Sequence, residues 1–119
     1  KENVDKILTE FVPKVVVGWG VHPVILPLQF GIVTAPGISK KIAAEQIVSH
    51  LGINSKDVLA VGDSTSDWQF IEPCGYKVAM GNATQELKDL VSSSDHEKSF
   101  IAPSVEENGI LEVFKHFGL

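Results

Sequence analysis

The stretch that decides the fold is Val58-Leu59-Ala60-Val61-Gly62-Asp63-Ser64-Thr65-Ser66-Asp67. Its apolar beginning predicts a short buried strand, and the glycine that follows marks the end of that strand. A carboxylate comes directly after the glycine, and a second one follows four residues later. In open parallel sheets, ligands bind outside the carboxyl ends of the strands, so Asp63 is expected at the edge where a ligand would lie.

The acidic loop has the chemistry of a magnesium site. The small residues between Asp63 and Asp67 let the loop bend and supply hydroxyl groups. Two carboxylates and several hydroxyls in one tight loop suit a hard cation such as Mg²⁺, which takes oxygen ligands and keeps several waters. The alternative, in which both aspartates are only turn or cap residues, stays open at this point.

A lysine upstream is expected to return to the same edge of the sheet. Ser39 is a plausible N-cap, and Gly52 ends the helix that follows it. The apolar residues of that helix keep helical spacing: Ala44, Ile47, Val48 and Leu51. Since this helix runs back along the sheet before the strand over 58–61 returns, Lys40 in its first turn should lie near Asp63. A helix N-terminus favours anions, and a lysine there adds a positive charge. Lys41 is interpreted as a surface residue.

A third motif is Val78-Ala79-Met80-Gly81-Asn82-Ala83, in which a strand again ends in a glycine. Asn82 should lie on the same edge, where it would brace the acidic loop or the ligand. It fits a plain helix-entry residue equally well.

The order of the expected elements predicts an α/β fold. From Ser39 onward, helices and strands alternate, which indicates a parallel sheet with crossover helices. The expected strands cover 58–61, 76–80 and 100–102, and the expected helices cover 39–51, 67–72, 84–91 and a terminal segment after the capping box of Ser104 and Glu107. We expect Cys74, Phe114 and Phe117 in the core.

The first part of the chain does not alternate in this way, and turn residues at 35–37 suggest a boundary there. We expect a helix with apolar residues from Val4 to Phe11 that Pro13 ends, a strand at 15–17, a turn at 18–20, and one or two strands within 24–33, with Pro27 at an edge or bulge.

Composition limits the partners. The chain of 119 residues has a formal net charge of −5, which argues against general nucleic-acid binding. No apolar stretch is continuous enough for a membrane helix, so no membrane partner is expected. The single cysteine, Cys74, fits a reducing compartment, and we expect a cytoplasmic protein.

The three motifs resemble, in this order, the C-terminal half of Cof-type phosphatases of the haloacid dehalogenase (HAD) superfamily. The matching stretches are Pro36-Gly37-Ile38-Ser39-Lys40, Gly62-Asp63-Ser64-Thr65-Ser66-Asp67 and Met80-Gly81-Asn82-Ala83. The resemblance implies a partial HAD-type Rossmann-like core over residues 36–119, and residues 1–35 look like the tail of the α/β cap domain.

The resemblance also implies roles for individual residues. Asp63 would be a Mg²⁺ ligand, and Asp67 would support the metal loop, through a water or by orienting Lys40. Lys40 would contact the transferring phosphoryl group and the nucleophile. Ser66 stands where the family has an asparagine, and its shorter side chain gives no amide donor for the phosphate. Asn82 would complete the phosphate side of the site.

The family's nucleophile lies in an Asp-x-Asp motif, and no Asp-x-Asp occurs in this chain. In the family, the first aspartate attacks phosphorus and the second acts as acid and base. We therefore expect a piece of a longer protein, with the nucleophile on a missing N-terminal segment or, alternatively, on another chain. The parent would be a Mg²⁺-dependent phosphatase acting on a small phosphorylated metabolite such as a sugar phosphate, and this chain alone would be inactive. The alternative function is a catalytically silent binding module or homo-oligomer, since a truncated sheet leaves an unpaired strand edge.

Overall fold

The structure is a computed structural model that describes residues 2–8, 10, 14–21 and 28–119. The chain divides into two compact units, Lys1–Ser39 and Lys40–Leu119. The boundary expected at 35–37 lies a few residues before this division. The assignment of the first unit to a cap domain stays a prediction.

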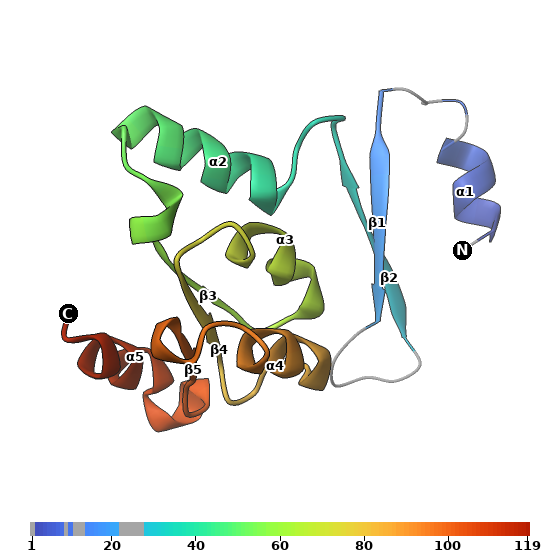
Figure 1. Cartoon of the computed structure of the whole chain (residues 1–119). Coiled ribbons are helices and arrows are strands. Elements are labelled where there is room, and N and C mark those ends of the chain that lie inside the picture. The colour runs from blue at the N-terminus through green and yellow to red at the C-terminus, as the bar shows by residue number, and fades with distance from the viewer. Residues whose placement is uncertain (1, 9, 11–13, 22–27) are drawn as a thin grey trace. The chain divides into compact units, whose positions relative to one another are not determined.

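The first unit consists of a helix and a two-stranded antiparallel sheet (Figure 1): α1 (Glu2–Leu8), β1 (Val16–Val21) and β2 (Gln29–Thr34). Trp19 lies opposite Gly31, and Gly20 lies opposite Phe30. A Cβ atom built on Gly31 would come within 3.1 Å of the Trp19 ring, and one on Gly20 within 2.8 Å of the Phe30 ring. Each ring therefore covers the glycine of the facing strand.

This pairing corrects one expectation. The predicted turn at 18–20 is wrong, because β1 continues through these residues. The glycines that suggested a turn are strand glycines, and one of them leaves space for an aromatic ring. The expectations for Phe11, Pro13 and Pro27 lie outside the described residues.

The second unit alternates helices and strands as expected: α2 (Lys40–Leu51), β3 (Leu59–Gly62), α3 (Trp68–Ile71), β4 (Tyr76–Ala79), α4 (Gln85–Ser92), β5 (Ser99–Ile101) and α5 (Gly109–Phe117). The strands form one sheet in the order β3-β4-β5, and both pairs are parallel. Figure 1 shows the helices around this sheet. The structure confirms the predicted parallel α/β fold.

Local signals set the ends of several elements. Gly52 has φ +64° and ends α2, which confirms its position after the helix. The Thr84 side chain accepts a hydrogen bond from the backbone N–H of Leu87 and begins α4. The predicted capping box is present, since Glu107 accepts hydrogen bonds from the backbone N–H and the hydroxyl of Ser104. The hydrogen bonds from Ser104 lower the pKa of Glu107 and outweigh its slight desolvation.

The core of the second unit lies on both faces of the sheet because side chains alternate along each strand. Ala79 belongs to a cluster on one face and Val78 to a cluster on the other. The first cluster contains the buried residues of α3 and α4: Ile71, Leu87 and Val91. The second contains Val113 of α5 together with Met80 and Ala102, which follow β4 and β5. Cys74 is buried, as expected, and burial raises the pKa of its thiol even though Lys77 and Lys56 act to lower it.

Two predicted core faces are only partly covered. Ile47 and Leu51 of α2 are 59% and 62% exposed, and Phe114 of α5 is 44% exposed, whereas Val113 is buried. The expectation that Phe114 lies in the core is therefore wrong for this chain. The described sheet has only three strands and ends at β3, so it is too narrow to cover the full apolar faces of both helices.

Gly62 is required for close packing where β3 ends. A Cβ atom there would lie 2.7 Å from Cβ of Asp67 and 2.8 Å from Cδ1 of Ile71. We expect Gly62→Ala to lower the free energy of unfolding by about 1–3 kcal/mol through overpacking, measured by urea denaturation. Gly18→Ala is the matched control, since nothing lies within 4 Å of a Cβ there. Equal stability of the two variants would contradict this packing.

Candidate functional site

The centre of the candidate site is an ion pair between the start of α2 and the loop after β3. The Lys40 Nζ atom donates a hydrogen bond to Oδ1 of Asp67 at 2.5 Å. The Asp67 side chain is 4% exposed, whereas that of Lys40 is 67% exposed. The carboxylate is therefore fixed inside the fold, and the ammonium group remains open to a ligand.

The second oxygen of Asp67 holds the loop itself. Oδ2 accepts hydrogen bonds from the backbone N–H groups of Asp63, at 3.0 Å, and Ser64, at 3.1 Å. The loop continues into a 3₁₀ turn over Thr65–Asp67, in which Ser64 and Asp67 form a capping box. Asp67 is thus a capping residue, as one of the two interpretations of the sequence expected. It also holds Lys40 in place.

These contacts keep Asp67 ionised. Burial of the carboxyl group raises its pKa, but the hydrogen bonds from Lys40 and from the N–H groups of Asp63 and Ser64, together with the charge of Lys40, outweigh this. The net result is a pKa of Asp67 below its ordinary value. The site therefore holds a fixed negative charge beside an exposed positive one.

The Asp63 side chain is exposed at the end of β3, while its backbone is firmly held. Its N–H group binds Asp67, and its carbonyl accepts a hydrogen bond from the N–H of Thr84 at 3.0 Å. A hydroxyl contact of 2.9 Å between Thr65 and Thr84 links the same two loops. The loops after β3 and β4 are therefore joined, and the Asp63 carboxylate is presented on a fixed backbone.

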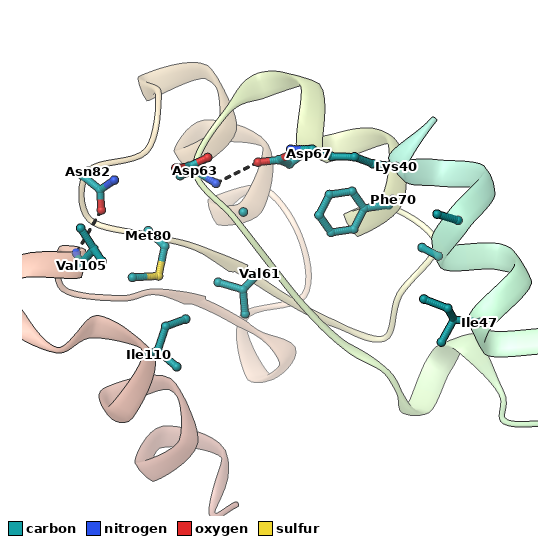
Figure 2. Close-up of a pocket in the computed structure, with 13 residues that line it drawn as sticks. Lys40, Ile47, Val61, Asp63, Asp67, Phe70, Met80, Asn82, Val105 and Ile110 are labelled. Atoms are coloured by element: carbon teal, nitrogen blue, oxygen red, sulfur yellow. Dashed lines mark hydrogen bonds and ion pairs between the residues drawn. The ribbon is translucent and has the colours of Figure 1, made fainter. Parts of the chain in front are cut away.

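Lys40, Asp63, Asp67 and Asn82 all line one cavity of about 650 Å³, which Figure 2 shows in close-up. The expected convergence of the lysine and the acidic loop on one edge of the sheet is therefore confirmed. Apolar residues form the rest of the lining: Ala43, Ala44, Ile47, Val61, Phe70, Met80, Val105 and Ile110. The cavity has a charged rim and an apolar floor.

The two remaining candidates are placed differently. The Asn82 side chain lies on the rim, and its Oδ1 accepts a hydrogen bond from the N–H of Val105 at 3.1 Å. Its amide N–H₂ group is the part that remains to meet a ligand. Ser66 is exposed and is not among the residues that line the cavity within 40–119. Its hydroxyl lies 2.9 Å from that of Ser64.

The donors around Asp63 fit Mg²⁺ as a partly hydrated ion. Within the described ranges 2–8, 10, 14–21 and 28–119, no three His, Cys, Asp or Glu side chains cluster as a metal site. Mg²⁺ commonly uses one or two carboxylates and fills its other positions with waters and substrate phosphates. The exposed carboxylate of Asp63 meets this need, whereas both oxygens of Asp67 are already hydrogen-bonded.

Two features of the site were not found from the sequence. The Lys88 Nζ atom donates a hydrogen bond of 2.5 Å to the carbonyl of Gly81 and holds the turn that carries Asn82. Val105 and Ile110 come from the segment after β5 and line the cavity. The only sequence signal for the contact between Lys88 and Gly81 is the position of Lys88 in the first turn of α4, shortly after the glycine motif.

Stability should depend on pH through Asp67. The pKa of Asp67 is lower in the folded state than its ordinary value of 3.8. The ionised carboxylate therefore stabilises the fold fully above pH 3.8, and this stabilisation is lost as the pH falls through the folded-state pKa. We expect Asp67→Asn to be less stable than the wild type at pH 7, and the difference to shrink below about pH 4. Urea titrations with chelator at several pH values measure this. The exposed-residue control Asp57→Asn should follow the wild type, and a difference independent of pH would contradict the assignment.

Comparison with known proteins identifies the class. The family model described as haloacid dehalogenase-like hydrolase matches residues 2–114. The chain belongs to the haloacid dehalogenase-like hydrolases. A structure of a haloacid dehalogenase-like hydrolase from Bacteroides thetaiotaomicron matches 95% of this chain and 38% of that chain, with a TM-score of 0.74 and 22% identity. That likeness supports the fold.

Several relatives are phosphatases by name. A phosphoglycolate phosphatase of Methanothermobacter thermautotrophicus is 31% identical over 71% of this chain and 35% of its own length. The putative phosphatase YkrA of Bacillus subtilis is 36% identical over 70% of this chain and 30% of its own length. A solved sugar phosphatase of HAD subclass IIB is 27% identical, with a TM-score of 0.66, over 98% of this chain and 40% of that one. The chain thus spans about a third of the length of these curated relatives.

Proposed function

We propose that this chain is the metal and phosphate side of a Mg²⁺-dependent phosphatase that hydrolyses a phosphate monoester of a small metabolite. The observation that carries the proposal is the arrangement of Lys40, Asp67 and Asp63 around one cavity. The exposed ammonium group of Lys40 and the exposed carboxylate of Asp63 lie on a common rim, and the buried carboxylate of Asp67 holds that ammonium group and the backbone N–H of Asp63. This rim suits a phosphate group with its cation.

Each residue has a separate task in the proposed reaction. Lys40 binds the phosphoryl oxygens and offsets their charge as it changes during transfer. Asp63 provides the carboxylate for Mg²⁺, which when bound acts as a Lewis acid on the phosphoryl group. Asp67 positions the Lys40 ammonium group and the Asp63 backbone. The amide group of Asn82 donates to the phosphate, and the hydroxyl of Ser66 remains a candidate donor from the same loop.

The nucleophile of the proposed reaction lies outside this chain, on a segment of the same protein. The absence of an Asp-x-Asp motif supports this, as does the small share of each relative that the chain covers. The named relatives support phosphoglycolate or sugar phosphates as the substrate class. A cytoplasmic location belongs to the same proposal. Among the described residues, no helix combines the length and apolar character needed to cross a membrane.

The test is hydrolysis of p-nitrophenyl phosphate with Mg²⁺. We expect no turnover by the 119-residue chain, turnover by a longer form of the protein that contains it, and loss of that turnover on Asp63→Ala. Turnover by the chain alone would contradict the placement of the nucleophile. A longer form that binds Mg²⁺ but hydrolyses no phosphate monoester would contradict the proposed reaction.

A second candidate function is a silent binding or assembly module, including a homo-oligomer. The partly exposed apolar residues Ile47, Ile110 and Phe114 favour it, because they lie on helices that flank a sheet ending at β3. Sedimentation of the 119-residue chain at several concentrations distinguishes the two candidates, since only the module self-associates through these faces.

A further inference from the structure

The turn between β4 and α4 is held by the segment that follows β5. The N–H of Ala83 donates to the carbonyl of Met80 at 2.8 Å and closes the turn. The N–H of Gly81 donates to the carbonyl of Pro103 at 3.1 Å. A Cβ atom built on Gly81 would lie only 2.6 Å from the backbone nitrogen of Ser104, so the turn packs directly against this segment.

Lys88 holds the same turn from α4. Its Nζ atom donates a hydrogen bond of 2.5 Å to the carbonyl of Gly81. Leu87 and Val91 of the same helix are 0% exposed, so α4 is anchored in the core. Lys88 forms no ion pair with any residue that the structure describes, and a charged donor makes a stronger hydrogen bond than a neutral one. The carbonyl of Gly81 is therefore fixed by a charged group on a rigid helix.

The carbonyl of Gly81 and the N–H of Asn82 belong to one peptide group. In a planar trans peptide these two bonds point in opposite directions, so the N–H of Asn82 points away from Lys88. The side-chain Oδ1 of Asn82 accepts from the N–H of Val105, as Figure 2 shows. Among the residues described, 2–8, 10, 14–21 and 28–119, neither the backbone N–H nor the side-chain amide group of Asn82 has an acceptor. Asn82 thus brings two available donors to the cavity rim.

We propose that Lys88 is a positioning residue, which holds the peptide before Asn82 so that the backbone N–H and the side-chain amide of Asn82 both donate to the phosphate. The ammonium charge polarises this peptide through its carbonyl, and hydrogen bonds in such a chain strengthen one another. The role of Asn82 toward phosphate rests on the proposed function, whereas the hold of Lys88 on the turn does not.

The first measurement is a titration of the 119-residue chain with inorganic phosphate at saturating Mg²⁺. Lys88→Met keeps the length of the side chain and removes the donor, and we expect it to weaken phosphate binding by about tenfold. Mg²⁺ affinity should stay at the wild-type value, because Asp63 supplies the metal carboxylate. Lys77→Met is the matched control, since it removes a similar contact of 2.6 Å with the carbonyl of Cys74, and it should bind phosphate as the wild type does. Loss of both affinities in Lys88→Met would show a general structural role and would overturn the proposal.

A double-mutant cycle separates positioning from direct attraction of phosphate by the Lys88 charge. The loss caused by Lys88→Met should be smaller in an Asn82→Ala background, where only the backbone N–H remains to be positioned. In the wild type, phosphate should also shift the backbone amide proton of residue 82, and Lys88→Met should reduce this shift. A loss that is undiminished in the Asn82→Ala background would overturn the positioning role.

Hydrogen exchange without phosphate or metal separates this proposal from the proposed function. Lys88→Met should speed exchange of the Gly81 and Val105 amides by about tenfold, because both N–H groups are held at this turn, and Lys77→Met should not. Unchanged exchange, or faster exchange with wild-type phosphate affinity, would overturn the positioning role of Lys88 alone. A wild-type chain that binds no phosphate would remove the proposed function and the role of Asn82, and exchange would still decide whether Lys88 holds the turn.

Discussion

Replacing Asp67 with alanine is expected to lower the free energy of unfolding by about 3 kcal/mol. The substitution leaves the N–H groups of Asp63 and Ser64 without their acceptor and releases the ammonium group of Lys40. A carboxylate that is almost fully buried among three donors is more costly to remove than an exposed one. Urea denaturation at pH 7 measures the change.

The control for this prediction is Asp57→Ala in an exposed turn, which should change stability by no more than about 0.5 kcal/mol. Lys40→Met should fall between the two, because it removes one of the three donors and leaves a buried carboxylate with its backbone contacts. An Asp67→Ala variant as stable as Asp57→Ala would show that the loop does not depend on this carboxylate.

Replacing Asp63 with asparagine is expected to weaken Mg²⁺ binding by at least about 100-fold. Mutation of a residue that only hydrogen-bonds to a metal ligand already lowers metal affinity by up to about 100-fold, and loss of the ligand itself should lower it at least as much. The fold should persist, because Asp63 contributes to the loop through its backbone N–H and carbonyl. Calorimetry with Mg²⁺, or the relaxation of water protons with Mn²⁺, measures the affinity.

Asp57→Asn is the matched control for metal binding and should keep the wild-type affinity. Circular dichroism of the Asp63→Asn variant should match the wild type, which separates loss of the ligand from loss of the fold. A variant that binds Mg²⁺ as tightly as the wild type would remove Asp63 from the site and would leave the loop with a capping role only.

Short-range patterns in the sequence predicted most of the second unit correctly. The apolar run over 58–61, the glycine after it and the alternation of helices with strands gave the parallel sheet. These predictions succeed because a buried strand, a helix end and a capping box depend on neighbouring residues. The edge shared by Lys40 and Asp63 followed from the crossover geometry of such sheets.

The predictions that failed depend on partners distant in sequence. Gly18 and Gly20 suggested a turn, but the strand persists because β2 pairs along its length and Phe30 covers Gly20. Phe114 keeps helical spacing with Ile110 and Phe117, but this spacing does not reveal how wide a sheet lies beneath the helix. The contact of Asn82 with Val105 was not predicted, because it joins two loops that only the fold brings together.

The roles of Asp67 illustrate the same limit. Its position in the motif indicated a metal site, a turn or support for the lysine, and spacing alone does not separate these. Both oxygens of Asp67 accept hydrogen bonds, one from the lysine and the other from the loop backbone. This arrangement supports a positioning role for Asp67 and leaves Asp63 as the carboxylate available to a cation.

The phosphate site is tested most directly by a titration of the 119-residue chain with inorganic phosphate in the presence of Mg²⁺, followed by amide chemical shifts. We expect shifts at Lys40, Asp63 and Asn82, and an affinity that falls by about tenfold or more on Lys40→Met. Lys41→Met, one position along α2, should bind phosphate as the wild type does. Equal affinities of the two variants, or shifts at the opposite end of the sheet, would contradict a phosphate site built from the lysine and the acidic loop.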